Sequence, residues 1–259
     1  MLGGSQTLVR RFVAVGDSLT EGVGDPRGPG LGGWADRLAA RLDRASPGLE
    51  YANLAVRGWC VRHVRRHQLA PALALRPDLV SVMAGANDAF GPGLDLARVE
   101  EDLDVVVGSL TASGARVLTG TLPDLTASWP VPALLSAPVR ARFAAVNGVV
   151  RAVAARHGAL LIDFWHDPRT GGPGTWSIDG IHPSAHGHAA IADAAAELLG
   201  LPPEGEPPVA PAGLAALAAR AAEVRSLGAL LGDVVLRPGL PRQRPRPASG
   251  DAAGATRVW

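Results

Sequence analysis

Short apolar segments alternate with longer segments of helical periodicity over the first 200 residues, and this alternation constrains the fold more than any other feature. The apolar segments are candidate strands, at residues 8–15, 51–54, 79–84, 116–119 and 160–163. The longer segments are candidate helices, at residues 34–44, 61–75, 94–112, 139–157 and 185–199. Strands that alternate with helices in this way are typical of a parallel sheet covered by helices. We therefore expect an α/β protein.

The composition excludes several classes of protein. The chain of 259 residues has a net charge of +1, which argues against a dedicated nucleic-acid-binding surface. Cys60 is the one cysteine, so neither a disulfide framework nor a cysteine-rich metal site is possible. Lysine is absent, which excludes Schiff-base and P-loop chemistry. No apolar segment has the length of a signal peptide or a membrane span, so we expect a cytoplasmic protein.

The composition changes after residue 200. Residues 201–211 contain five prolines and are expected to form an extended linker after an α/β domain at residues 1–200. Residues 212–231 are rich in alanine and leucine, which predicts one further helix. Residues 232–259 combine arginines with prolines, and we expect a flexible tail there.

Two polar motifs follow predicted strands. Ser18 comes directly after the first strand, where a tight turn would expose its hydroxyl group. Asp179 and His182 lie three residues apart in the bend before the last helix, so the carboxylate can orient the imidazole as a general base. Taken alone, each motif is also typical of a helix cap or a capped turn.

Two further motifs follow the second and third strands. Gly58 allows the backbone to approach a ligand closely, and Asn87 carries a side-chain amide that can donate a hydrogen bond. Either residue alone is also typical of an ordinary turn. Ligands of open α/β sheets bind beyond the carboxyl ends of the strands, and all four motifs are expected at that edge.

Together the four motifs resemble the blocks of the GDSL esterase/lipase family, also called SGNH hydrolases. The resemblance covers about residues 12–199 and implies a three-layer α/β/α sandwich of flavodoxin-like type, with a five-stranded parallel sheet. It implies that Ser18 is the nucleophile, His182 the general base and Asp179 the acid that orients it. The oxyanion hole would consist of the backbone N–H groups of Ser18 and Gly58 and the side-chain amide of Asn87. Neither a metal ion nor an organic cofactor is required.

The resemblance predicts an acylhydrolase and leaves its ester open, because the family acts on lipids, acetylated sugars, thioesters and small esters. Connections between the predicted elements are short, so we hypothesise an open site for short acyl or acetyl groups on a small-molecule or lipid ester. Three tryptophans in the predicted cleft loops could line an acyl pocket or belong to the core: Trp129, Trp165 and Trp176. The glycine-rich residues 22–33 are interpreted as a mobile loop beside the cleft rather than a phosphate site.

Two alternatives to a serine esterase remain. Asp179 and the histidines His182, His186 and His188 could hold the metal of a metal-dependent hydrolase. The same fold could also serve as a catalytically silent binding protein. The oligomeric state is open, and no nucleic-acid partner is expected.

Overall fold

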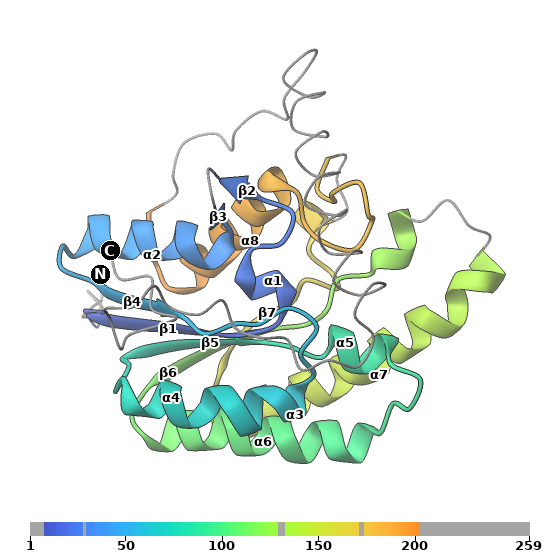
Figure 1. The fold of residues 1–259 in the computed structure, drawn as a ribbon, viewed down its shortest axis with the longest axis horizontal. Helices are drawn as coiled ribbons and strands as arrows, with labels where there is room; N and C mark the ends of the chain where they lie inside the picture. Colours follow the sequence, from blue (N-terminus) through green and yellow to red (C-terminus); the bar gives the residue numbers. More distant parts are fainter. Residues whose placement is uncertain (1–7, 28–29, 129–132, 171–173, 203–259) are drawn as a thin grey trace, which may run out of the picture.

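The computed structural model of the protein describes residues 8–27, 30–128, 133–170 and 174–202. A five-stranded sheet forms its centre, in the order β4-β1-β5-β6-β7, and every neighbouring pair is parallel. The strands are β1 (Arg11–Gly16), β4 (Glu50–Asn53), β5 (Leu79–Met83), β6 (Arg116–Gly120) and β7 (Leu160–Ile162). Figure 1 shows helices on both faces of this sheet, which confirms the expected α/β/α sandwich.

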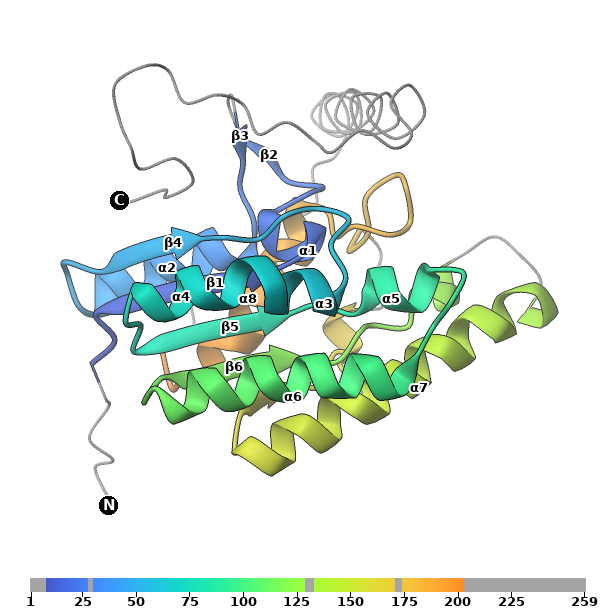
Figure 2. The ribbon, with the colours of Figure 1, turned by 60° about the horizontal axis from the view of Figure 1, so that its bottom comes forward.

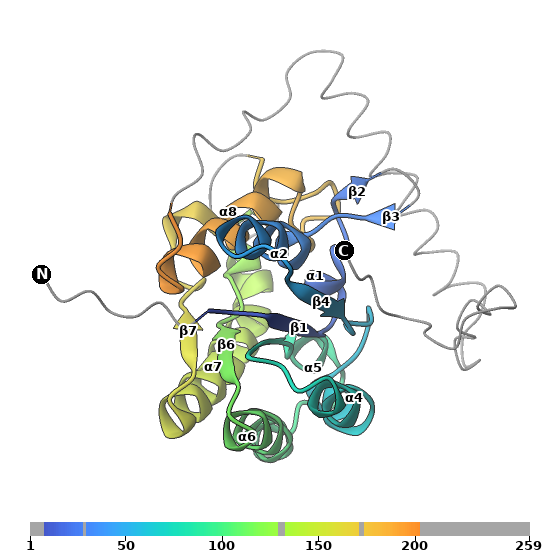
Figure 3. The same ribbon diagram turned by 90° about the vertical axis from the view of Figure 1, so that its left-hand side faces the viewer.

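Two hydrophobic cores hold the three layers together. On one face lie α2 (Trp34–Ala45) and α8 (Ala185–Leu198); on the other lie α6 (Leu96–Ala112), α7 (Ala133–His157) and a helix over residues 61–74 (Figure 3). Side chains of β1 alternate between the two cores, because successive residues of a strand point to opposite faces. Burial on both faces explains why the strands read as continuous apolar segments.

The helix over residues 61–74 is not regular throughout. It consists of α3 (Val61–His63), the π-helical turn η1 (Val64–Gln68) and α4 (Leu69–Ala74). π-helical turns inside α-helices are rare and occur frequently at functional sites. The last residue of this turn, Gln68, lies beside the end of β1 and is hydrogen-bonded to Gly16.

All carboxyl ends of the parallel strands lie at one edge of the sheet. The strand order reverses direction at β1, which is the arrangement that places ligand sites in flavodoxin-like folds. Two one-turn helices begin at this edge, α1 (Ser18–Glu21) after β1 and α5 (Ala86–Phe90) after β5 (Figure 2). The motifs after β1, β4 and β5 therefore meet at this edge of the sheet.

Some predicted boundaries differ from the structure. β1 begins at Arg11 rather than at residue 8, because Arg11 is the first residue in register with a residue of β4, Glu50. The helix predicted from residue 139 begins at Ala133 and runs through Pro138. The glycine-rich segment contains a small antiparallel hairpin, β2 (Pro26–Arg27) and β3 (Gly30–Leu31). Two short 3₁₀ turns, η2 (Leu125–Ser128) and η3 (Pro168–Thr170), were not predicted.

The predicted helix at residues 212–231 and the predicted tail at residues 232–259 lie outside the described residues, as does most of the predicted linker. In the part that is described, no helix combines the length and the apolar character needed to span a membrane. The cytoplasmic location stays a prediction.

Candidate active site

The turn after β1 presents Ser18 at the carboxyl edge of the sheet. Gly16 ends the strand with φ +150°, and a β-carbon there would lie 2.1 Å from the carbonyl oxygen of Met83, so only glycine fits. Asp17 is the N-cap of α1, and its carboxylate accepts a hydrogen bond from the Leu19 N–H at 3.1 Å. Ser18 is therefore the first residue of a helical turn. The backbone leading into this turn is constrained by the close packing at Gly16 and by the hydrogen bond from Leu19 to Asp17.

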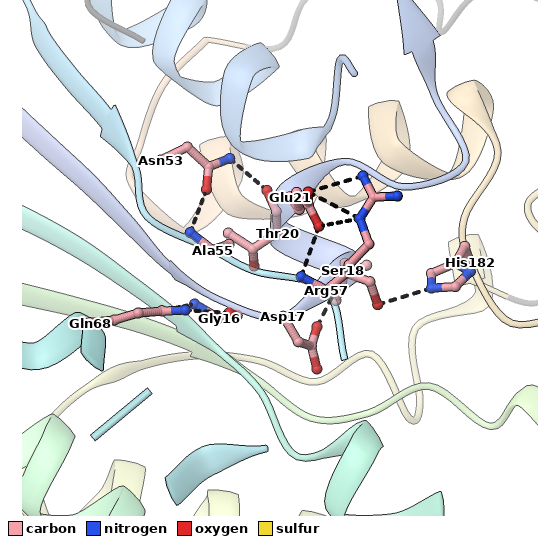
Figure 4. Close-up of polar contacts among 11 residues, drawn as sticks. Gly16, Asp17, Ser18, Thr20, Glu21, Asn53, Ala55, Arg57, Gln68 and His182 are labelled. Carbon is pink, nitrogen blue, oxygen red and sulfur yellow. Dashed lines mark hydrogen bonds and ion pairs between the residues drawn. The ribbon is translucent and has the colours of Figure 1, made fainter. Parts of the chain in front are cut away.

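The structure brings Ser18, His182 and Asp179 into one hydrogen-bonded chain. Nε2 of His182 lies 2.9 Å from Oγ of Ser18, and Nδ1 lies 2.6 Å from Oδ2 of Asp179. Figure 4 shows the imidazole reaching the serine from a loop that is 164 residues away in sequence. The side chains of His182 and Asp179 are only 16% and 10% exposed, so this chain of hydrogen bonds is partly shielded from water.

Asp179 is held as a carboxylate by its donors. Oδ1 accepts hydrogen bonds from the Ser177 hydroxyl at 2.7 Å and from the N–H groups of Ile181 and His182 at 2.8 and 2.9 Å. Burial acts to raise the pKa of Asp179, but the hydrogen bonds and charge of His182, with the Ile181 N–H, outweigh it and hold the pKa well below its usual range. An ionised Asp179 orients Nδ1–H towards itself and leaves Nε2 of His182 as the acceptor for Ser18.

The two other predicted site residues lie at the same edge. Gly58 is exposed in a turn with φ +76°, a left-handed conformation that favours glycine. The Asn87 side chain comes from α5, and its Nδ2 donates to Oδ2 of Asp17 at 3.1 Å and to the carbonyl of Trp59 at 3.0 Å. Both N–H bonds of this amide are thus used inside the protein, so a contact to substrate requires that one of them be exchanged.

Asp17 connects the turn that carries Ser18 to Asn87. It is buried, and burial raises its pKa to about 7, even though the Leu19 N–H, the His182 charge and the Asn87 amide act in the opposite direction. Asp88, beside Asn87, accepts a hydrogen bond from the Val61 N–H at 3.0 Å. Both carboxyl groups act as hydrogen-bond acceptors that hold turns.

Sequence analysis missed Gln68, the last residue of η1. Its side chain is buried and bonds Gly16 twice, accepting from the N–H at 2.7 Å and donating to the carbonyl at 2.8 Å (Figure 4). The sequence nevertheless contains a signal for Gln68. It is the one polar residue on the inward face of the helix, which Val61, Val64 and Ala72 otherwise form. A buried polar side chain on an apolar face must have a partner, and here the partner is Gly16 in the turn before Ser18.

An ion pair fastens the loop after β4 to α1. Arg57 donates from Nε and from its backbone N–H to Oε2 of Glu21, at 2.9 and 2.8 Å, and from Nη2 to Oε1 at 3.0 Å (Figure 4). Nδ2 of Asn53 donates to the carbonyl of Thr20 at 2.7 Å. Because Arg57 directly precedes Gly58, these contacts fix the glycine relative to the helix that begins with Ser18.

A small apolar cavity lies beside the hydrogen-bonded chain of Ser18, His182 and Asp179. Its volume of about 10 Å³ is comparable to the space for a single water molecule. It is lined by Leu19, Pro123, Phe164, Thr170, Thr175, Trp176, Pro183, Gly187 and Ile191. Leu19 and Pro183 directly follow Ser18 and His182. Of the three tryptophans, Trp176 lines this cavity, Trp165 packs against the core under Arg140, and Trp129 lies outside the described residues.

Two of the three histidines of the alternative metal site, His182 and His188, use both ring nitrogens in hydrogen bonds within the protein. His188 is buried, with Nδ1 accepting from the Trp34 N–H at 3.2 Å and Nε2 bonded to the Val23 carbonyl at 2.9 Å. Neither nitrogen is available to a metal ion while these bonds persist. Among the residues that the structure describes, no three His, Cys, Asp or Glu side chains are grouped as metal ligands would be.

The fold and the site define a carboxylic ester hydrolase of α/β type, and comparison with known proteins identifies the family. Residues 14–190 match the GDSL-like lipase/acylhydrolase family, and the chain belongs to it. The sequence is 26% identical over 202 residues to an acetylxylan esterase of Geobacillus stearothermophilus, a match that covers 71% of this chain and 91% of that protein.

Solved structures share the fold. LAE5, an α/β hydrolase from the metagenome of Lake Arreo, superimposes with a TM-score of 0.64 at 24% identity, covering 78% of this chain and all of that one. A variant of Axe2, an acetyl xylan esterase from Geobacillus stearothermophilus, gives a TM-score of 0.63 at 22% identity over 76% of this chain and 97% of that one. TesA gives 0.60 at 23% identity over 73% and 97%.

Proposed function

We propose that the protein is a serine esterase that hydrolyses short-chain carboxylic esters through an acyl intermediate on Ser18. One observation carries the proposal, the distance of 2.9 Å between Nε2 of His182 and Oγ of Ser18. At this distance the imidazole can accept the hydroxyl proton while the oxygen attacks an ester carbonyl. Membership of the family supports ester hydrolysis, and this geometry supports serine as the nucleophile.

The reaction has two halves. Oγ of Ser18 bonds to the carbonyl carbon as its proton passes to Nε2 of His182, and the imidazolium formed is stabilised by Asp179. His182 then gives that proton to the alcohol oxygen as the ester bond breaks, which leaves the acyl group on Ser18. In the second half a water molecule takes the place of the serine hydroxyl, with His182 again accepting and returning the proton.

The oxyanion hole would consist of the N–H groups of Ser18 and Gly58 and the amide of Asn87. Negative charge grows on the carbonyl oxygen during attack, so fixed donors stabilise the transition state more than the bound substrate. In the protein without substrate, Nδ2 of Asn87 is shared between Asp17 and the Trp59 carbonyl. One of these two bonds is exchanged for the oxyanion, and the growing negative charge favours that exchange.

We further propose that the acyl group is short, because the small cavity lined by Leu19 and Pro183 offers no preformed channel for a long acyl chain. The acetylxylan esterase among the relatives supports the same conclusion, because an acetyl group is the smallest common acyl group. We expect acetate and butyrate esters to be hydrolysed faster than long-chain esters. Faster hydrolysis of long-chain esters would contradict this part of the proposal.

The central test combines kinetics with a serine-directed probe. Ser18→Ala should lower kcat for ethyl acetate by about 10³-fold or more, without lowering Tm. A fluorophosphonate should label the wild-type protein and Ser113→Ala but not Ser18→Ala. Ser113 is the matched control because it is exposed at the end of α6 and its hydroxyl group donates to the Leu110 carbonyl, at 2.7 Å.

The same measurements separate the two alternative functions. Absence of both labelling and ester hydrolysis in the folded wild-type protein would favour a silent binding protein. Activity that survives in Ser18→Ala but is abolished by a chelator would favour a metal-dependent hydrolase. Either result overturns the proposed function.

A further inference from the structure

Asp17, the residue before Ser18, uses both carboxylate oxygens inside the protein. Oδ1 accepts a hydrogen bond from the Leu19 N–H at 3.1 Å, and Oδ2 accepts one from Nδ2 of Asn87 at 3.1 Å. The residue is only 2% exposed, and Figure 4 shows its carboxylate pointing in a different direction from the Ser18 hydroxyl group. Asp17 is therefore placed to act on the reaction through Asn87 rather than on the serine itself.

The side-chain amide of Asn87 has two unlike ends. Nδ2 carries two N–H bonds, whereas Oδ1 can only accept hydrogen bonds. An oxyanion also only accepts, so Asn87 can contribute to an oxyanion hole only with Nδ2 directed into it. A half-turn of the amide would exchange the two ends with almost no change in shape. The orientation of this amide must therefore be set by its hydrogen-bond partners.

Both partners of Nδ2 are hydrogen-bond acceptors. They are the carboxylate of Asp17 and the backbone carbonyl of Trp59, at 3.1 and 3.0 Å. If the amide turned over, its Oδ1 would face a carboxylate and a carbonyl oxygen, and two hydrogen bonds in a partly buried site would be lost, which is costly. These two acceptors therefore determine which end of the amide lies on this side.

The two bonds differ in strength. A hydrogen bond to a carboxylate is roughly twice as strong as one between neutral groups. Asp17 is also buried, whereas Trp59 is partly buried, so the loss of a donor would leave a buried charge poorly satisfied at Asp17. The Trp59 carbonyl is thus the partner that Asn87 gives up when it turns an N–H towards the oxyanion.

We propose that Asp17 is a positioning residue of the oxyanion hole, which keeps Nδ2 of Asn87 directed into the hole while the bond to the Trp59 carbonyl is exchanged for the oxyanion. The inference rests on the proposed esterase function and adds to it a residue other than Ser18, His182 and Asp179. In this role Asp17 acts through Asn87 and does not touch the substrate.

Asp17→Asn tests the orientation of the amide. Its single side-chain oxygen can accept from Leu19 or from Asn87 but not from both, so an NH2 group that faces Asn87 makes the Asn87 amide turn over. Asparagine caps helices as well as aspartate does, so Tm should change little. We expect kcat for ethyl acetate to fall by about 10²–10³-fold, the usual cost of one oxyanion donor, and KM to change by less than about threefold.

The kinetics are measured at about pH 8.5 by acid release at constant pH. Burial raises the pKa of Asp17 to about 7, so at this pH the wild-type side chain is a carboxylate. The matched control is Asp95→Asn. Asp95 is the exposed N-cap of α6 and accepts from the Arg98 N–H at 3.1 Å, so the same substitution there should leave kcat unchanged.

Asp17→Ser separates two opposite effects of the carboxylate. The serine hydroxyl can still cap α1, but its side chain is one bond shorter and leaves Nδ2 of Asn87 without this acceptor. A fall in kcat would show that Asp17 positions the amide, even if Asp17→Asn folds poorly. An unchanged or raised kcat would show that Asp17 only competes with the oxyanion for Nδ2, and would overturn the inference.

A double-mutant cycle shows whether Asp17 acts through Asn87. Asn87→Ala alone should lower kcat about as much as Asp17→Asn does. Adding Asp17→Asn to Asn87→Ala should lower kcat by less than about threefold more, because the amide that Asp17 positions is already absent. Two effects that multiply would mean that Asp17 acts on the turn of Ser18 independently of Asn87, which would also overturn the inference.

The same variants separate a failure of this inference from a failure of the proposed function. Wild-type kcat in Asn87→Ala, together with lost activity and lost fluorophosphonate labelling in Ser18→Ala, would leave the acyl-serine mechanism standing and remove Asn87 and Asp17 from it. Activity that is independent of Ser18 would overturn the proposed function, and this inference with it.

Discussion

The side-chain amide of Gln68 bonds both the N–H and the carbonyl of Gly16, at 2.7 and 2.8 Å. The side-chain amide of Asn147 makes the same pair of bonds to Leu122, just after β6. It accepts from the Leu122 N–H at 2.6 Å and donates to the Leu122 carbonyl at 2.8 Å. A side-chain amide carries both a donor and an acceptor, so one residue satisfies both backbone groups where a strand leaves the sheet. Of these two amides, only that of Gln68 bonds the turn that carries Ser18.

This pair of contacts permits a matched test. Gln68→Met and Asn147→Leu remove the amides with little loss of volume, and each should lower the free energy of unfolding by about 1–3 kcal/mol because buried backbone groups lose their partners. Gln68→Met should also lower kcat by about 10–100-fold, since small displacements of a nucleophile are costly. Urea unfolding and ethyl acetate kinetics measure both effects. A destabilised Gln68→Met with wild-type kcat would contradict a positioning role.

Asp179 should contribute to the rate mainly through the orientation of His182. Asp179→Asn can donate where the carboxylate accepts, which favours the wrong tautomer of the imidazole, and kcat should fall by about 10²–10⁴-fold. Ser177→Ala removes one of four hydrogen bonds to the carboxylate and should have a much smaller effect on kcat. Equal losses in the two variants would show that the loop has collapsed in both, which circular dichroism would detect.

His188 should make the fold sensitive to acid. Burial lowers its pKa to about 4, although its hydrogen bond to Val23 acts in the opposite direction. The folded protein therefore binds fewer protons than the unfolded chain between about pH 6.5 and 4, and the free energy of unfolding falls as pH falls through this range. His188→Gln can keep both hydrogen bonds without titrating. Its Tm should depend less on pH between 6.5 and 4, whereas parallel curves for the two proteins would contradict the assignment.

Gly24 should be required for the position of the histidine loop. Its φ is +100°, and a β-carbon there would lie 2.0 Å from the carbonyl oxygen of Pro183, the neighbour of His182. Gly48 has φ +97° with no other atoms within 4 Å, so it is a control for backbone strain alone. The strain of a left-handed φ should lower the free energy of unfolding by about 1–2 kcal/mol in both Gly24→Ala and Gly48→Ala. Only Gly24→Ala should also lower kcat, and unchanged kinetics there would show that the loop can shift without consequence.

The strands and long helices could be predicted because burial on both faces leaves continuous apolar segments, and because helical periodicity survives in each amphipathic helix. The β2–β3 hairpin could not, since its sequence is mostly glycine and proline and carries no periodic pattern. An ion pair lies beside it, between Arg37 and Asp25 at 2.7 Å, and sequence does not show such a tertiary contact. The one-turn helices α1 and α5 are too short to produce a periodic signal.

The proximity of Ser18, Asp179 and His182 could be anticipated because motifs at the carboxyl ends of parallel strands share one edge. The hydrogen bonds from Asn87 to Asp17 and Trp59 could not, because they depend on how α5 is set against the loop after β4. The same limitation applies to Gln68, whose partner lies 52 residues away in sequence. Sequence pattern indicated the candidate catalytic residues, whereas the contacts that position them follow from tertiary packing.

The separation of 164 positions in sequence between Ser18 and His182 has a practical consequence for protein engineering. A break between the exposed residues 92 and 93 would place Ser18 and Asn87 in one fragment and the imidazole with its carboxylate in the other. Neither fragment alone could turn over an ester. Fusing the two fragments to a pair of interacting proteins would make ester turnover a readout of their association.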